Sequence, residues 1–373
     1  MKMGYGRFPV KTALALLFTS LAAPGFADMS ILRQPVAVGV YEMVYNEAQH
    51  SVLVATTEDR SEQGGIVYEL DPQTLSVLHA IKTDHKPFGA ALNSRTHTAW
   101  FGGSIDGSLM AVDTESGKVK GSVTLVPQSA MPKKAEKAAP HDGKPSADKM
   151  KQRDDHRPPA PRELRVDEAS NKVYVSGVNR DDSVLWIVDG NTMKLKTTLH
   201  GLGKLNTGLA IDSDSHRLFT TNADGEFITI NTSNDTVLAR QKIVSDGHEH
   251  LLMNIALDTQ GHRAFVADNK AATILVVDTR DDKVIHRIAA PESLSVLFNP
   301  LRNQLYAAHR NAGTVSVIDG TSYAVINTLK LPVHPNSLAL ASTGDVFYVS
   351  VKQESSHGEG THAPDDVVRV SLK

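Results

Sequence analysis

Short apolar runs separated by turn-forming residues recur along most of this chain. The clearest example is Leu294–Leu331, which reads as four consecutive strands, the first of them ending at the turn Asn299-Pro300. Apolar or alternating runs bounded by Gly, Pro, Asn or Asp are typical of antiparallel β-strands. One such four-stranded sheet leaves an apolar face uncovered, so we expect further copies of the unit to cover it.

The copies are found by their spacing. In the reference unit, Tyr306 follows Asn299 by 7 positions and Asp319 follows it by 20. The equivalent triplets are Asn46, Leu53, Asp71; Asn93, Trp100, Asp113; Asp167, Tyr174, Asp189; Asp212, Phe219, Asn231; Asp258, Phe265, Asp278; and Ala341, Tyr348, Ser371. Their first members lie 47, 74, 45, 46, 41 and 42 residues apart. Four strands in each period of roughly 40–50 residues predict an all-β fold, a seven-bladed β-propeller.

The repeated side chains have structural explanations. Aromatic residues on the second strands are expected in the core between blades rather than on a binding surface. The repeated aspartates are expected to cap the turn into the outermost strand, because Asp readily bonds the backbone of its own turn.

The two ends of the chain complement each other. Arg33–Val40 reads as a strand that precedes the first unit, whereas the last unit ends after its third strand, Val367–Leu372. We therefore predict that the N-terminal strand completes the last blade and closes the ring, which leaves few exposed sheet edges.

Residues 1–27 have the pattern of a secretory signal peptide. Lys2, Arg7 and Lys11 are followed by the apolar run Ala13–Leu21, and Gly25-Phe26-Ala27 provides small residues at a cleavage site. The run is too short for a membrane span, and no other apolar run is long enough. We predict a periplasmic, monomeric protein whose mature propeller comprises residues 28–373.

The spacing of 74 residues marks an insertion at about residues 126–161. It contains eight basic and five acidic residues, is rich in proline and has almost no large apolar residues. Such a composition predicts a disordered loop, because little apolar surface is available to offset the cost of ordering. It acts either as a solvated spacer or as a docking arm for an acidic or protein partner.

Composition excludes several classes of site. The chain has no cysteine, which rules out disulfides, thiolate catalysis and cysteine-ligated metal centres. Its net charge is −3, and loss of the three basic residues of the signal peptide gives −6 for the mature chain. A protein with this net charge is not expected to bind nucleic acid through its whole surface.

Several motifs resemble those of a known family. Lys86–Gly89, Thr220–Gly225, Ala289–Ser293 and His334–Leu340 are similar to stretches of the periplasmic YVTN-repeat propellers. The resemblance implies a secreted seven-bladed propeller with no established enzymatic activity and no cofactor. It also implies an association with single-stranded DNA binding and with growth under iron limitation.

Binding residues are expected where loops gather at one mouth of the central channel. The candidate ligand-binding residues there are Lys86, Phe88, Arg162, Lys204, Asn254, Arg310, His334 and Asn336. Arg162, Lys204 and Arg310 would contact the phosphates of single-stranded DNA or another acidic ligand, and Phe88 would stack on a base. Two carboxylates, Glu42 and Glu163, are expected among these basic residues at the mouth.

The alternative is a metal-dependent lyase or lactonase-type enzyme at the same mouth. Glu42 and Glu163 could act as an acid–base pair, although their places in the first and third blades argue against direct contact. His248-Glu249-His250 is one short, weakly specific pattern for a metal site. The sequence contains none of the common catalytic motifs, so it favours a non-enzymatic binding or scaffold protein without a metal.

Overall fold

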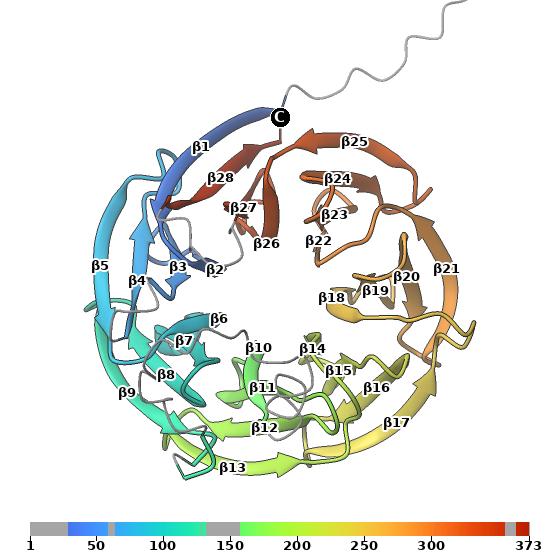
Figure 1. Ribbon diagram of the computed structural model, residues 1–373, viewed down its shortest axis with the longest axis horizontal. Helices are drawn as coiled ribbons and strands as arrows, with labels where there is room; N and C mark the ends of the chain where they lie inside the picture. Colours follow the sequence, from blue (N-terminus) through green and yellow to red (C-terminus); the bar gives the residue numbers. More distant parts are fainter. Residues whose placement is uncertain (1–28, 59–63, 128, 132–156, 355–362, 373) are drawn as a thin grey trace, which may run out of the picture.

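The computed structural model describes residues 29–58, 64–127, 129–131, 157–354 and 363–372. The strands form seven four-stranded antiparallel sheets, which are arranged around a common axis like the blades of a propeller (Figure 1). Both the all-β class and the seven-bladed architecture predicted from the sequence are confirmed.

Blades one to four follow one another along the chain. Blade one contains β2 (Val40–Asn46), β3 (Ser51–Thr56), β4 (Gly65–Leu70) and β5 (Val77–Thr83). Blade two contains β6 (Pro87–Asn93), the 3-10 turn η1 (Ser94–Thr96), β7 (Thr98–Gly103), β8 (Ser108–Asp113) and β9 (Lys118–Thr124). Blade three contains β10 (Ala160–Asp167), β11 (Lys172–Val178), β12 (Val184–Asp189) and β13 (Lys194–Leu199). Blade four contains β14 (Leu209–Asp212), β15 (Arg217–Thr221), β16 (Glu226–Asn231) and β17 (Thr236–Lys242).

Blades five to seven continue in the same order. Blade five contains β18 (Leu252–Asp258), β19 (Arg263–Asp268), β20 (Thr273–Asp278) and β21 (Lys283–Ala289). Blade six contains β22 (Ser295–Asn299), β23 (Gln304–His309), β24 (Thr314–Asp319) and β25 (Val325–Lys330). Blade seven contains β26 (His334–Leu340), β27 (Val346–Lys352), β28 (Asp365–Ser371) and, as its outer strand, β1 (Ser30–Ala37).

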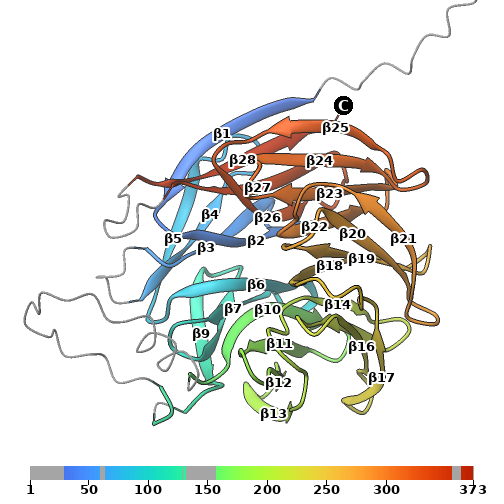
Figure 2. The same cartoon turned by 45° about the vertical axis from the view of Figure 1, so that its right-hand side comes forward.

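The ring is closed as predicted, by pairing of the two ends of the chain. Strand β1 is antiparallel to β28, from Ser30 opposite Ser371 to Ala37 opposite Asp365, and Figure 2 shows it running outside that strand. The predicted bounds, Arg33–Val40, were wrong at both ends. Gly39 turns the chain with a φ of +75°, and Val40 already belongs to β2.

The core lies between neighbouring blades. The repeated aromatic residues are at most 1% exposed, which confirms their structural role; they are Trp100, Tyr174, Phe219, Phe265, Tyr306 and Tyr348. Packing crosses the blade boundaries, as where Tyr306 of blade six stacks on Phe347 of blade seven with ring centroids 4.4 Å apart. Each blade therefore covers the apolar face of the next.

The turn between the third and fourth strands is nearly the same in blades one to six, whereas in blade seven the fourth strand, β1, comes from the other end of the chain. Asp113, Asp189, Asp278 and Asp319 accept hydrogen bonds from backbone amides two or three residues later, as predicted. The residue four positions after the aspartate or its equivalent is left-handed, with φ between 54° and 64°; these residues are Leu75, Gly117, Met193, Asp235, Asp282 and Tyr323. This regularity makes positions in different blades directly comparable.

Two predicted segments lie wholly or mostly outside the described residues. They are the signal peptide, residues 1–27, and the greater part of the insertion, residues 132–156. At the edges of the insertion, Val126 is buried and Ala160 begins β10, so both belong to the propeller. Within the described part of the chain, no helix has the length and apolar character needed to cross a membrane.

Candidate ligand site at the channel mouth

The inner strands are irregular near the mouth of the channel. Five of them lose register with their partner at β-bulges: β2 after Val40, β6 after Pro87, β10 after Pro161, β18 after Leu252 and β26 after Pro335. Proline has no N–H to offer to the sheet, which explains why three of the bulges begin there. A bulge redirects the side chains that it contains.

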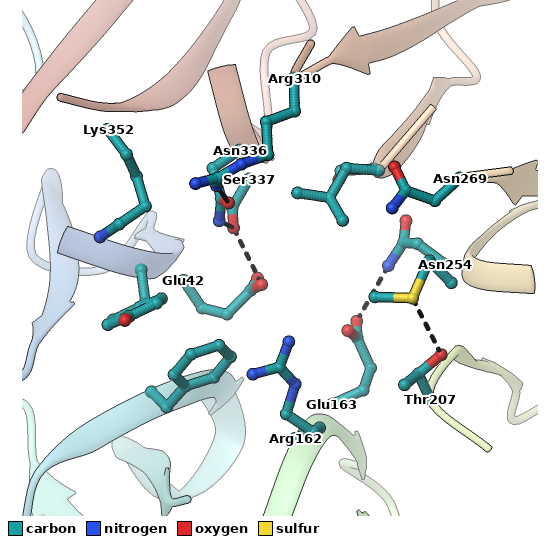
Figure 3. A pocket seen from close by; sticks show the side chains of 15 residues that line it. Glu42, Arg162, Glu163, Thr207, Asn254, Asn269, Arg310, Asn336, Ser337 and Lys352 are labelled. Carbon is teal, nitrogen blue, oxygen red and sulfur yellow. Dashed lines mark hydrogen bonds between the residues drawn. The ribbon is translucent and has the colours of Figure 1, made fainter. Parts of the chain in front are cut away.

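The bulged residues line a cavity of about 360 Å³ at the mouth, which we call the mouth pocket (Figure 3). Its lining residues are Tyr41, Glu42, Phe88, Arg162, Glu163, Thr207, Met253, Asn254, Asn269, Leu294, Ser295, Arg310, Asn336, Ser337 and Lys352. All seven blades, or the connections that lead into them, contribute to this lining. The mouth pocket is therefore a product of the closed ring rather than of any one blade.

Two aromatic rings lie between two cations along one side of the mouth pocket. The Arg162 guanidinium lies 4.2 Å from the centroid of Phe88, whose ring lies 4.0 Å from that of Tyr41. The Lys352 ammonium follows, 3.9 Å from the Tyr41 centroid. Burial lowers the pKa of Arg162, and the nearby Tyr41, Glu42 and Glu163 counteract part of that effect. Phe88 is thus in contact with Arg162 and Tyr41 on the wall of the pocket, and its stacking on a nucleotide base stays a prediction.

Two carboxylates share the pocket with these cations. Burial, and then the charge of Glu163, raises the pKa of Glu42 from 4.5 to about 7, while a hydrogen bond from Ser337 Oγ at 2.9 Å opposes the rise. Glu163 is held by Arg165 at 2.7 Å and accepts a bond from Asn254 Nδ2 at 3.3 Å. Their places in the first and third blades therefore do not isolate the two carboxylates, which interact electrostatically across the channel.

Five of the eight predicted site residues meet in the mouth pocket: Phe88, Arg162, Asn254, Arg310 and Asn336. Arg310 Nη1 donates to Asn336 Oδ1 at 2.7 Å, and Asn254 Oδ1 accepts from Val296 N at 3.0 Å. These contacts fix the orientation of the polar groups before any ligand is present.

The other three predicted residues lie outside the pocket lining. Lys86 is buried, and its Nζ donates to Thr57 O at 2.6 Å. Lys204 is exposed, with its backbone N bonded to Asp224. His334 places Nδ1 3.2 Å from Arg310 O and so supports the backbone beside Arg310.

The list of predicted site residues omitted Tyr41, Asn269 and Lys352. A signal for the last two was present in the repeat, because Asn269, Arg310 and Lys352 each follow the reference position of their unit by 11 residues. That position lies at the end of, or just after, the second strand, where its side chain reaches the pocket.

The histidine pattern has a structural explanation. His250 Nδ1 lies 2.6 Å from Asp268 Oδ2 and its Nε2 lies 2.8 Å from Asp246 Oδ1, so both ring nitrogens are engaged. His309 is buried between Ser293 and Ser316. Over the described ranges, no three His, Cys, Asp or Glu side chains are grouped so that they could hold a metal ion.

Comparison with known proteins identifies close relatives. The chain is 46% identical over 361 residues to a YncE protein of Salmonella typhimurium, a match that covers 96% of each chain. It is 47% identical over the same length, again with 96% of each chain covered, to a YncE protein of Escherichia coli. Both relatives are described as uncharacterized proteins. No protein-family model matches the chain.

Proposed function

The chain belongs to the family of the YncE β-propeller proteins, and from that premise we propose that it is a non-enzymatic binding protein whose ligand enters the mouth pocket. One observation carries this proposal: every blade directs residues to a single cavity, and five inner strands give up their regular pairing to do so. Its volume of about 360 Å³ is within the range of small-molecule and cofactor sites.

The charges of the lining favour an anionic ligand. Three cations, Arg162, Arg310 and Lys352, face two carboxylates, and one of these, Glu42, has its pKa raised to about 7 and is partly neutral near that pH. The amides of Asn254, Asn269 and Asn336 add donors and acceptors around the same space. Charge-assisted bonds to an anion, with amides that fix its orientation, are the chemistry such a pocket offers.

We propose single-stranded nucleic acid as that ligand, in keeping with the family resemblance. Arg162 and Arg310 would contact phosphates of a nucleotide that fills the pocket. The exposed Lys204 would contact a further phosphate of the same strand. The base would stack on Phe88, as predicted from the sequence, and its polar edge would meet the amides. Secretion into the periplasm and a link to iron limitation are further predictions from the N-terminal pattern and the resemblance.

Nucleic-acid binding can be tested with a labelled single-stranded oligonucleotide. Two or three phosphate contacts predict that log K falls with log salt with a slope of about −1.5 to −2. The substitution Arg310→Gln should weaken binding by about tenfold, the loss expected for one charge-assisted contact. The measurement is fluorescence anisotropy at several salt concentrations.

Arg280 provides the matched control for this experiment. It is exposed on a turn between third and fourth strands, away from the mouth, so Arg280→Gln should leave binding unchanged. Affinity that does not depend on salt, or equal losses in the two variants, would refute the proposed contacts.

One observation favours a second candidate function, an enzyme at the same site. A glutamate whose pKa is raised to about 7 by burial and by the charge of a second carboxylate is suited to general acid–base catalysis. For a lyase or lactonase of this kind, Glu42→Gln should abolish turnover of lactone substrates with added divalent ions. If the unsubstituted protein shows no turnover, this candidate is excluded for those substrates.

A further inference from the structure

The interface between blades three and four is joined by a buried carboxylate. Asp235, the left-handed residue of the blade-four turn, has a side chain that is only 4% exposed. It accepts hydrogen bonds from three donors of blade three: Lys172 Nζ at 3.0 Å, Lys196 Nζ at 2.6 Å and Tyr174 OH at 3.3 Å. A carboxylate buried in this way requires such partners.

The corresponding interface between blades two and three retains donors but lacks the carboxylate. At the same repeat positions blade two has Thr98, Lys120 and Trp100, while blade three has Met193 in place of Asp235. Lys120 Nζ donates to Thr98 Oγ1 at 3.1 Å, and the carboxylate of Asp113 is 3.8 Å away. The methionine side chain offers no anionic acceptor.

Two polar atoms at this interface are buried without a partner. The indole Nε1 of Trp100, a fully buried residue, has no hydrogen-bond acceptor among the described residues, and the same holds for the hydroxyl of Thr96. Leaving a buried donor without an acceptor costs free energy. Such atoms call for an acceptor that is not part of the described chain.

A cavity of about 240 Å³ lies next to these groups. It is lined by Thr96, Thr98, Trp100, Ala111, Lys120, Asn171, Gly190, Asn191 and Met193. Its lining includes the turn that joins the first and second strands of blade two and the turn that joins the third and fourth strands of blade three. In antiparallel blades these turns lie at the end opposite the mouth, so this cleft is distinct from the mouth pocket.

We propose that this cleft binds a small carboxylate such as acetate. Acetate is the detached equivalent of an aspartate side chain, so its carboxylate would take the place that Asp235 has in the next interface. Lys120 would supply the charge and the Trp100 indole a neutral donor, while the apolar atoms of Met193 and Ala111 would contact the methyl group.

The two tryptophans of the chain make the proposal testable by NMR. The chain has two tryptophans and therefore two indole N–H resonances, which the variant Trp186→Phe assigns. Trp100 lines the cleft and Trp186 does not, so the Trp186 resonance is an internal control. Sodium acetate at millimolar concentration should shift the Trp100 resonance saturably and leave that of Trp186 in place. Sodium chloride at the same ionic strength should shift neither.

Substitutions distinguish acetate binding in the cleft from a general effect of anions on the protein. Lys120→Met should weaken the acetate response by about tenfold or more, and Met193→Asp should abolish it by providing a carboxylate within the chain. The matched controls are Lys118→Met, an exposed lysine on the same strand, and Met193→Leu; both should keep the response. The proposal is overturned if the Trp100 resonance of the unsubstituted protein does not move, or if chloride moves it equally.

Discussion

At the scale of single residues, Glu42 is a group at the channel mouth whose charge changes near neutral pH. Its pKa is raised to about 7 by burial and by the charge of Glu163, so the folded protein keeps a proton there that the unfolded chain loses near pH 4.5. Stability therefore falls as the pH rises from about 4.5 to about 7, and the penalty is complete above that range.

Glu42→Gln should remove this penalty. The variant should be more stable than the parent protein above neutral pH by about 1–2 kcal/mol, a figure reduced from the full shift because solvent reaches the mouth. Near pH 4.5 the difference should vanish, because the parent carboxyl is then protonated. Urea unfolding at a series of pH values measures this. A constant difference at all pH values would show that Glu42 does not titrate as described.

Phe88 shows what could and could not be predicted for the site at this scale. The repeat register placed it at the mouth correctly, because equivalent positions of the blades have equivalent locations. Its engagement by Arg162 and Tyr41 depends on contacts between residues 41, 88 and 162, which come from three different blades. The same limit applies to Lys86, whose ammonium turns away to the Thr57 carbonyl.

At the scale of elements, a carboxylate secures the connection into blade five. Asp268, at the end of β19, is fully buried and accepts hydrogen bonds from the backbone amides of Leu251, Lys270 and Ala271. It also holds His250, which Asp246 contacts from the other side. Burial lowers the pKa of His250, but the hydrogen bonds to the two aspartates outweigh it and raise the pKa overall.

Asp268→Ala should destabilise the protein by about 3 kcal/mol, because three amides and a histidine lose their acceptor. Asp246→Asn, on a half-exposed side chain, should cost much less and serves as the control. The stability that His250 contributes should be present below its ordinary pKa of about 6.5 and be lost as the pH rises through its raised value. Denaturant unfolding of the three proteins at acidic and alkaline pH measures both effects. Equal midpoints for Asp268→Ala and the parent would contradict this account.

The strands could be predicted from the sequence, but the bulges could not. Alternation and turn residues identify a strand such as β23, whereas the departures from pairing at Pro87, Pro161 and Pro335 appear only when partner strands are known. These departures create the mouth pocket. The elements were therefore predictable from local patterns, and the site required their assembly.

At the scale of the whole molecule, the seven blades are so similar that a residue which departs from the repeat points to a local difference in structure. The period predicted seven blades because each must cover the apolar face of its neighbour. It did not predict the cleft between blades two and three, since Thr98 and Met193 become exceptions only beside Lys172 and Asp235. Recognising the cleft requires the repeat register, which pairs these positions, and the structure, which shows that they meet at a blade interface.

Ring closure is the remaining property of the whole molecule. Strand β1 covers the otherwise open edge of β28, and Arg33 joins Asp366 with its Nη2 2.5 Å from Oδ2. Leu32 packs against the core shared by blades seven and one, so β1 supports the point at which the ring would open. A chain that begins at Val38 instead of Met29 should therefore lose about 3–5 kcal/mol and self-associate through the exposed edge of β28.

The truncation removes both strand β1 and the ion pair between Arg33 and Asp366, so a second variant is needed to separate the two contributions. Arg33→Gln in the longer chain should cost at most about 1 kcal/mol, because Arg33 is partly exposed and the backbone ladder of β1 remains. Denaturant midpoints and size-exclusion chromatography measure the stability and the self-association of the chain from Met29, the chain from Val38 and the Arg33→Gln variant. If the chain beginning at Val38 unfolds at the same midpoint as the longer chain and stays monomeric, then the contacts between blades hold the ring by themselves and β1 is not what closes it.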